Sequence, residues 1–180
     1  MIRTRVGYAG GTRENPTYHK LGDHTETLQV DYDPAKISYE KLLEIFWQEH
    51  DPTSRSWSAQ YKAAVFFQGD EQKRLALETR DRVAARLGKA IHTELIPLSR
   101  FYPAEAYHQK YYLRDQKRLL KELQRYYAAE VDLMNSTAAA RLNGYLGGSG
   151  GAETLKAEID RYGLSEEGRS ELLRLAEAKR

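Results

Sequence analysis

Apolar and polar residues alternate along three stretches of the chain, which is the pattern of half-buried strands. In one of them Leu28, Val30 and Tyr32 alternate with polar neighbours, so their side chains are expected to face a core. A continuous apolar run, AAVFF, instead predicts a central strand. The strands are therefore predicted at residues 2–8, 26–32, 63–67 and 91–98.

Segments with the spacing of apolar residues typical of helices lie between these strands and after them. Ser38 is placed to cap a helix over residues 38–49, and Gly88 to end a helix that starts at Asp70. A tyrosine-rich run predicts one long helix over residues 104–127. Three shorter helices are predicted beyond it, at residues 136–146, 152–162 and 165–178.

The order of these elements predicts the fold class. Strand, strand, helix, strand, helix, strand, helix is not a strict βαβ repeat, which favours an α+β two-layer sandwich around a mixed sheet. The change in composition after Tyr127 predicts a second part made only of helices. We therefore expect a domain at residues 1–127 and a helical C-terminal extension at residues 128–180.

Charge and cysteine content narrow the possible functions. The chain has 28 basic and 26 acidic residues, and a net charge of +2 does not indicate a nucleic-acid partner. It has no cysteine, which excludes disulfides, thiolate metal ligands and thiol catalysis by these 180 residues alone. No apolar run reaches the roughly 20 residues of a membrane span, and no signal peptide is visible, so a cytoplasmic protein is expected.

The loop between the first two strands concentrates titratable side chains. Asp23, His19, His24 and Glu26 lie close together in sequence and could ligate a metal ion. The alternative is a loop whose side chains hydrogen-bond the local backbone. Because no third histidine lies nearby, we favour the loop interpretation and assign no metal ligand.

Glu26 and two tyrosines are candidates for acid catalysis or oxyanion binding. A carboxyl group that starts a strand beside apolar residues could be desolvated and hold a proton near neutral pH. The alternative is an exposed, ionised Glu26. Tyr18 and Tyr61 could donate hydrogen bonds to a developing oxyanion, although most tyrosines are simply half-buried.

A glycine-rich run, GYLGGSGG, covers residues 144–151. It lacks the lysine and the preceding strand of a phosphate-binding loop. The run is therefore predicted to end a helix and to join it flexibly to the next.

Several longer motifs occur in order along the chain: VGYAGGTRENPTY, GDHTET, YDPAKISYEKLLEIFW, HDPT, QY and FYPAEAYHQKYY. Together they resemble the peptide methionine sulfoxide reductase A family, over residues 3 to about 114. The GDHTE form, WSAQY and STAAARLNGYLGG are similar to one subgroup of that family, which extends the resemblance into the C-terminal part.

The resemblance implies a fold, a reaction and a set of site residues. The fold is the ferredoxin-like α+β sandwich, and the reaction returns methionine-S-sulfoxide, free or in proteins, to methionine in repair after oxidative damage. By motif, Glu26 would protonate the sulfoxide oxygen, while Tyr18 and Tyr61 would hydrogen-bond it. No cofactor is bound in the family, and thioredoxin or other thiols are the reductants. A monomer without nucleic-acid or membrane partners is expected.

The family's nucleophile is a cysteine in a glycine-cysteine-phenylalanine-tryptophan motif, which precedes the strand that starts here at Ile2. The resemblance thus implies an N-terminally shortened chain that is inactive alone. Losing the family's first strand would expose backbone groups of its neighbours and lower stability. Ser56 stands where many members have an aspartate.

Two other interpretations remain open. One is a non-catalytic module that binds methionine sulfoxide, or a partner protein, through Tyr18, Glu26 and Tyr61. The other is a structural adaptor built on the helices of residues 128–180.

Overall fold

The computed structural model describes residues 2–179. The chain divides into two compact units. One comprises residues 6–104, and the other combines the described residues 2–5 with residues 105–179. Each is described by itself.

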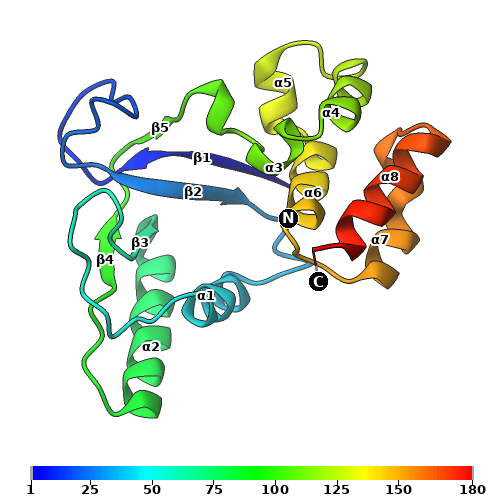
Figure 1. The fold of residues 1–180 in the computed structure, drawn as a ribbon. Helices are drawn as coiled ribbons and strands as arrows, with labels where there is room; N and C mark the ends of the chain where they lie inside the picture. The colour runs from blue at the N-terminus through cyan, green and yellow to red at the C-terminus, as the bar shows by residue number, and fades with distance from the viewer. Residues whose placement is uncertain (1, 180) are drawn as a thin grey trace. The chain divides into compact units, whose positions relative to one another are not determined.

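The strands form two sheets (Figure 1). The first has the order β2-β1-β5, with β1 at Arg3–Ala9, β2 at Thr25–Asp31 and β5 at Phe101–Pro103. Strands β1 and β5 are antiparallel. The second sheet pairs β3, Ala64–Phe67, with β4, Glu94–Pro97, in parallel.

Two helices complete the unit of residues 6–104. Helix α1, Tyr39–Gln48, begins where the Ser38 hydroxyl accepts a hydrogen bond from the Lys41 backbone N–H at 3.1 Å, and α2, Gly69–Leu87, ends at Gly88 in the left-handed conformation. The predicted helices and both end signals are confirmed. Helix α2 packs against α1, β3 and β4. Their small core contains five buried residues: Leu43, Trp47, Val65, Ala76 and Val83.

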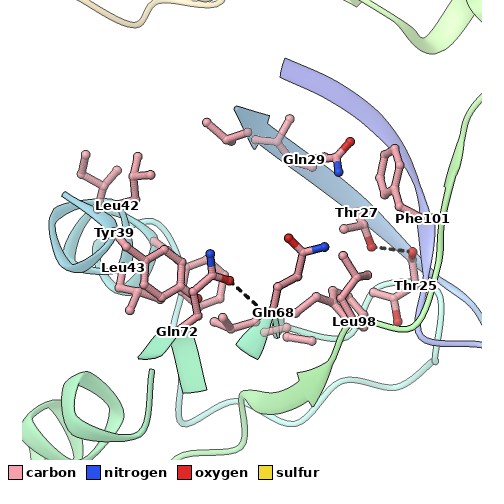
Figure 2. Close-up of a pocket in the computed structure, with 18 of the residues that line it drawn as sticks. Thr25, Thr27, Gln29, Tyr39, Leu42, Leu43, Gln68, Gln72, Leu98 and Phe101 are labelled. Atoms are coloured by element: carbon pink, nitrogen blue, oxygen red, sulfur yellow. Dashed lines mark hydrogen bonds between the residues drawn. The ribbon is translucent and has the colours of Figure 1, made fainter. Parts of the chain in front are cut away.

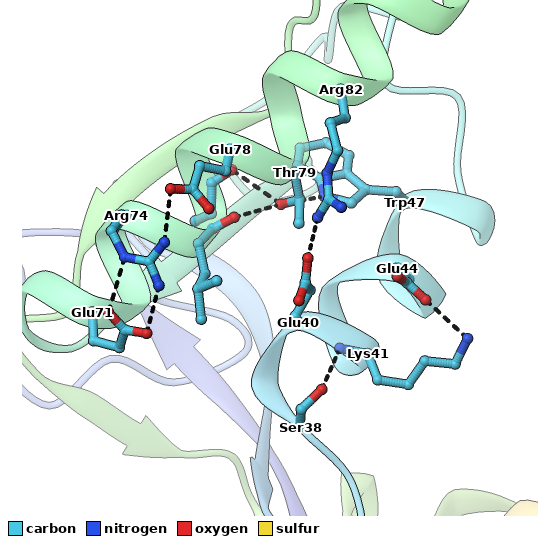
Figure 3. A network of polar contacts seen from close by, with 12 residues as sticks. Ser38, Glu40, Lys41, Glu44, Trp47, Glu71, Arg74, Glu78, Thr79 and Arg82 are labelled. Atoms are coloured by element: carbon cyan, nitrogen blue, oxygen red, sulfur yellow. Dashed lines mark hydrogen bonds and ion pairs between the residues drawn. The ribbon is translucent and has the colours of Figure 1, made fainter.

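One buried hydrogen bond crosses from α1 to α2 in this core. The Trp47 indole Nε1–H donates to Thr79 Oγ1 at 3.0 Å, and the same hydroxyl donates back to its own helix at the Leu75 carbonyl, 2.9 Å away. Figure 3 shows this contact beside an ion pair of Glu40 with Arg82, which also joins the two helices. The indole thus satisfies its one donor inside the core.

The other unit is built from helices around a larger core. They are η1 (Ala106–His108), α3 (Tyr111–Arg114), α4 (Lys117–Gln124), α5 (Glu130–Asn135), α6 (Thr137–Leu146), α7 (Ala152–Glu158), η2 (Ile159–Tyr162) and α8 (Glu166–Glu177). Fourteen buried residues, from Leu113 to Ala176, form one cluster. Ser136 and Ser165 cap α6 and α8 through their side chains.

Lys110 ties three segments of this unit together. Its ammonium group donates hydrogen bonds to the Thr4 carbonyl at 2.5 Å and to the Met134 carbonyl at 2.8 Å. Only 5% of the residue is exposed. Burial, with Arg5 and Arg114 nearby, lowers the pKa of Lys110 to about 8.

The α+β class and the helical C-terminal region are confirmed, but some predicted elements are wrong. The single helix over residues 104–127 is broken into η1, α3 and α4. Lys110, left-handed with φ of 56°, interrupts it before α3, and Gln116, with φ of −101° and ψ of 76°, separates α3 from α4. The strand predicted at residues 91–98 covers only Glu94–Pro97, as β4. Strand β5 and helix α5 were not predicted.

The second strand is half-buried as predicted at Val30 and Tyr32, but the prediction is wrong at Leu28. Leu28 is 60% exposed.

Gly147 caps the end of α6, and Gly148 and Gly150 have positive φ, as expected for a glycine-rich helix end. Among residues 2–179, no helix is long and apolar enough to cross a membrane. The division at residues 127 and 128 stays a prediction.

Candidate functional site

The loop from Gly10 to His24 is held by side chains that bond its backbone. The buried His24 ring accepts a hydrogen bond from the Gly11 N–H through Nδ1 at 3.1 Å, which leaves Nε2–H to donate to the Arg13 carbonyl at 2.7 Å. The Asp23 carboxylate accepts from the Thr12 N–H at 2.8 Å. A side chain at position 11 would lie within 2.6 Å of Asp23 and His24, so only glycine fits.

These contacts confirm the loop interpretation of the histidine and carboxylate cluster. Both ring nitrogens of His24 are occupied by the backbone, and the His19 ring instead lies edge-on to Tyr18 with centroids 5.3 Å apart. In the described part of the chain, no three His, Cys, Asp or Glu residues are grouped so that they could hold a metal ion.

Tyr18, Glu26 and Tyr61 come together although 43 positions separate the first from the last. The hydroxyls of Tyr18 and Tyr61 are hydrogen-bonded, and Glu26 is near enough to act on Tyr61 electrostatically. All three side chains are exposed, Tyr18 by 37% and Tyr61 by 49%. The hypothesis of a desolvated Glu26 is therefore wrong, because the Glu26 side chain is exposed although the neighbouring Thr25 is buried.

The Tyr61 hydroxyl is kept in its protonated form. Partial burial raises the pKa of Tyr61, and the neighbouring Tyr18 and Glu26 raise it further. A protonated phenol can donate a hydrogen bond to an acceptor oxygen near neutral pH. The cluster is thus an exposed group of hydroxyl donors beside a carboxyl group.

Two residues of this site were not predicted. The Gln60 side chain lies between Glu26 and Tyr61 and bonds both of them. Trp57 is 84% exposed, and its ring centroid lies 5.6 Å from that of Tyr61. Both lie within five residues of Tyr61 in WSAQY, so their closeness in sequence was the available signal.

The family model described as peptide methionine sulfoxide reductase matches residues 1–139. The chain belongs to this family. A second model, for the helical domain of selenoprotein methionine sulfoxide reductase A, matches residues 128–172. The family expected from the sequence motifs is confirmed.

Curated relatives of this reductase-family chain carry the same family name. A peptide methionine sulfoxide reductase of Drosophila melanogaster is 44% identical over 92% of this chain, and peptide methionine sulfoxide reductase A5 of Oryza sativa subsp. japonica is 41% identical over 81% of it. The matches span 67% and 59% of those two proteins. The chain therefore corresponds to about two thirds or less of these relatives' length.

Solved reductase structures share the fold. Mxr1 from Saccharomyces cerevisiae in reduced form matches with a TM-score of 0.59 at 28% identity, covering 63% of this chain and 71% of that one. Methionine sulfoxide reductase A of Corynebacterium diphtheriae matches with a TM-score of 0.54 at 29% identity, covering 63% of each chain.

An apolar groove opens beside the site of this reductase-family chain (Figure 2). Its volume is about 570 Å³, and its walls are β2, α1 and β3. In Figure 2, Leu42 and Tyr39 of α1 face Thr27 and Gln29 of β2 across it. Glu26 belongs to the lining, so the groove and the cluster share a residue.

Proposed function

We propose that this chain recognises methionine-S-sulfoxide, free or within oxidised proteins, through Tyr18, Glu26 and Tyr61. The observation that supports the proposal most is the convergence of these side chains on one exposed site. A sulfoxide oxygen carries partial negative charge and accepts hydrogen bonds, which phenol hydroxyls supply. An exposed site also admits a methionine side chain that is part of another protein.

Reduction needs a group that these 180 residues do not contain. A thiolate would attack the sulfoxide sulfur while one proton reaches the oxygen. Methionine would then leave, and the oxygen would remain on the thiol sulfur as a sulfenic acid. In this proposal Glu26 delivers the proton, and Tyr18 and Tyr61 stabilise the oxygen as its charge develops. The thiol comes from another polypeptide segment, and thioredoxin or another thiol restores it.

The groove has room for a separate segment that would bring the thiol, while this chain supplies the groups that bind the sulfoxide oxygen. It starts at Thr25 and Glu26 and runs between β2 and β3. Each of these strands has one edge without a partner strand among residues 2–179, because each lies at the end of its sheet. An extended thiol-bearing segment placed there would reach the same point as Glu26.

The wider role follows from the same proposal. We place the chain in repair of oxidised proteins after oxidative stress, as a cytoplasmic monomer that takes no bound cofactor. Its closely balanced charges support contacts with varied protein substrates more than with nucleic acid.

The test is the affinity for methionine-S-sulfoxide, measured by calorimetry on the intact chain. Glu26→Ala should weaken binding about tenfold, the effect of losing one hydrogen bond of about 1.4 kcal/mol that the protonated Glu26 carboxyl group donates to the sulfoxide oxygen. Glu153→Ala in α7 removes an exposed glutamate of the other unit and should change nothing. An affinity that Glu26→Ala leaves unchanged would remove Glu26 from the site.

A second candidate is a binding module with no catalytic role, which the complete lack of cysteine favours. The two candidates differ when a cysteine peptide with the glycine-cysteine-phenylalanine-tryptophan motif is added with dithiothreitol. If methionine forms faster with the chain and the peptide together than with the peptide alone, the first candidate is supported, a reductase whose thiol comes from another polypeptide segment. Binding of the sulfoxide without any added turnover supports the module.

A further inference from the structure

The segment of residues 59–61 is fastened to the start of β2 by its backbone. The Thr25 hydroxyl donates to the Ala59 carbonyl at 2.9 Å, and the Glu26 N–H donates to the Gln60 carbonyl at 3.0 Å. Thr25 is buried, with 2% of its surface exposed. These two hydrogen bonds hold the backbone of Gln60 directly beside that of Glu26.

The Gln60 amide uses both of its N–H donors within the site. Nε2 donates to Glu26 Oε1 at 2.7 Å and to the Tyr61 hydroxyl oxygen at 3.1 Å. The opposite orientation would place the amide oxygen against the carboxylate, where two acceptors repel each other. The geometry therefore selects the amide nitrogen for this position.

This bridge has a consequence for each partner. Because the Tyr61 oxygen accepts from Gln60, its own proton is directed away from Gln60 and toward Tyr18, where a ligand oxygen would take the place of the Tyr18 hydroxyl as acceptor. Because Glu26 Oε1 is held, its carboxyl plane is fixed and Oε2 remains for a ligand. Both effects organise the cluster before a ligand arrives.

We propose that Gln60 is the positioning residue of this site, which turns Tyr61 into a donor toward the bound oxygen and fixes the orientation of Glu26. Its role toward the sulfoxide rests on the proposed function. Gln60 itself need not contact the substrate, since its two amide protons are already used. Gln60→Leu removes the bridge while keeping a side chain of similar length.

The first test follows Tyr61 by NMR of chains labelled with carbon-13 at the tyrosine ζ carbon. Tyr18 and Glu26 are the titratable groups that face Tyr61, and the Gln60 hydrogen bond opposes their effect. Gln60→Leu should therefore shift the Tyr61 titration to higher pH. Gln48→Leu, an exposed position on α1, should leave it in place. A Tyr61 titration that is the same in Gln60→Leu and in the parent chain overturns the proposal.

The second test separates this inference from the proposed function. If the parent chain binds methionine-S-sulfoxide, Gln60→Leu should weaken binding about tenfold while its circular dichroism is unchanged. Unchanged affinity would mean that Gln60 positions nothing, even though the function stands. If the parent chain does not bind the sulfoxide, the proposed function fails, and the Tyr61 titration still decides whether Gln60 organises the cluster. In Gln60→Glu the new carboxylate repels Glu26 and should displace it. This variant should therefore also bind methionine-S-sulfoxide more weakly than the parent chain.

Discussion

Buried tyrosine hydroxyls are satisfied differently at one place in each of the two compact units. In the helical unit, Tyr145 and Tyr162 each donate to Glu158 Oε1 at 2.5 Å, and Arg141 balances that carboxylate at 3.1 Å. In the unit of residues 6–104, the buried hydroxyl of Tyr39 has no hydrogen-bond partner among the described residues. Burial, with Tyr32 nearby, raises the pKa of Tyr39 to about 12.

The apolar cores differ in the same direction. Among residues 2–179, the helical cluster has fourteen buried members and the cluster between α1, α2 and β3 has five. The smaller core lies beside the groove, whose wall includes Tyr39 and the exposed Leu28. We call the unit of residues 6–104, which carries the groove and the smaller buried cluster, the open unit, and the helical unit with the larger buried cluster the closed unit. An open unit of this kind is suited to receiving a ligand or a segment.

The largest effect is expected on the unfolding free energy of the closed, helical unit. Leu142→Ala in α6 removes a side chain with no exposed surface and should cost about 2–5 kcal/mol of unfolding free energy. Both tryptophans, Trp47 and Trp57, belong to residues 6–104, so their fluorescence follows that unit, while circular dichroism follows both. The circular dichroism transition should move to lower denaturant more than the fluorescence transition does.

Leu42→Ala is the matched control, because Leu42 lies half-buried in the groove wall. Its cost should be clearly smaller, since little packing is lost where the side chain already faces open space. Equal losses for the two variants would contradict the contrast between a closed and an open unit.

A smaller loss of stability is expected when the hydrogen bond in the core beside the groove is removed. Thr79→Val leaves the buried Trp47 indole N–H without an acceptor and should destabilise by about 1–3 kcal/mol. The fluorescence transition is the measurement. Thr79→Ser keeps the hydroxyl and should lose much less. If valine and serine cost the same, the hydrogen bond is not what holds α1 to α2.

The smallest effect is a pH dependence in the helical unit. The pKa of Lys110 is lowered to about 8 from an ordinary value of 10.5, so between these values the unfolded chain holds a proton that the folded chain has released. Stability from this group should therefore rise with pH in that window, by at most about 1.4 kcal/mol per pH unit. Below pH 8 the dependence should vanish.

Lys110→Met isolates this contribution, because the tyrosines and other lysines titrate alike in both chains. The difference in unfolding free energy between parent and variant should change with pH only above about pH 8. A difference that stays constant up to pH 10.5 would show that the buried ammonium group carries no penalty.

The sequence predicted the elements whose signals are local. Ser38 and Gly88 mark helix ends by their own chemistry, and both act as expected. The break at Lys110 depends on carbonyl groups of Thr4 and Met134, which no local pattern reveals. Strand β5 has three residues and is defined only by its pairing with β1.

The candidate site was predicted from motifs rather than from periodicity. Tyr18, Glu26 and Tyr61 were singled out by residue type and position, and the resemblance then gave them roles toward a sulfoxide. The structure brings them together, while those roles stay proposals. Gln60 was noted only as part of the QY motif and received no role, because its sequence position does not show what its side chain contacts. Its importance depends on the pairing of residue 60 with residue 26 across the fold.

One measurement tests most directly whether the open unit recognises methionine sulfoxide. Methionine-S-sulfoxide is titrated into the isotope-labelled chain with dithiothreitol present, and NMR follows both the protein and the ligand. We expect saturable shifts at Tyr18, Gln60 and Tyr61, weaker shifts with the R epimer, and no formation of methionine. Shifts confined to residues 105–179, no shifts at all, or methionine produced by the chain alone would contradict this expectation.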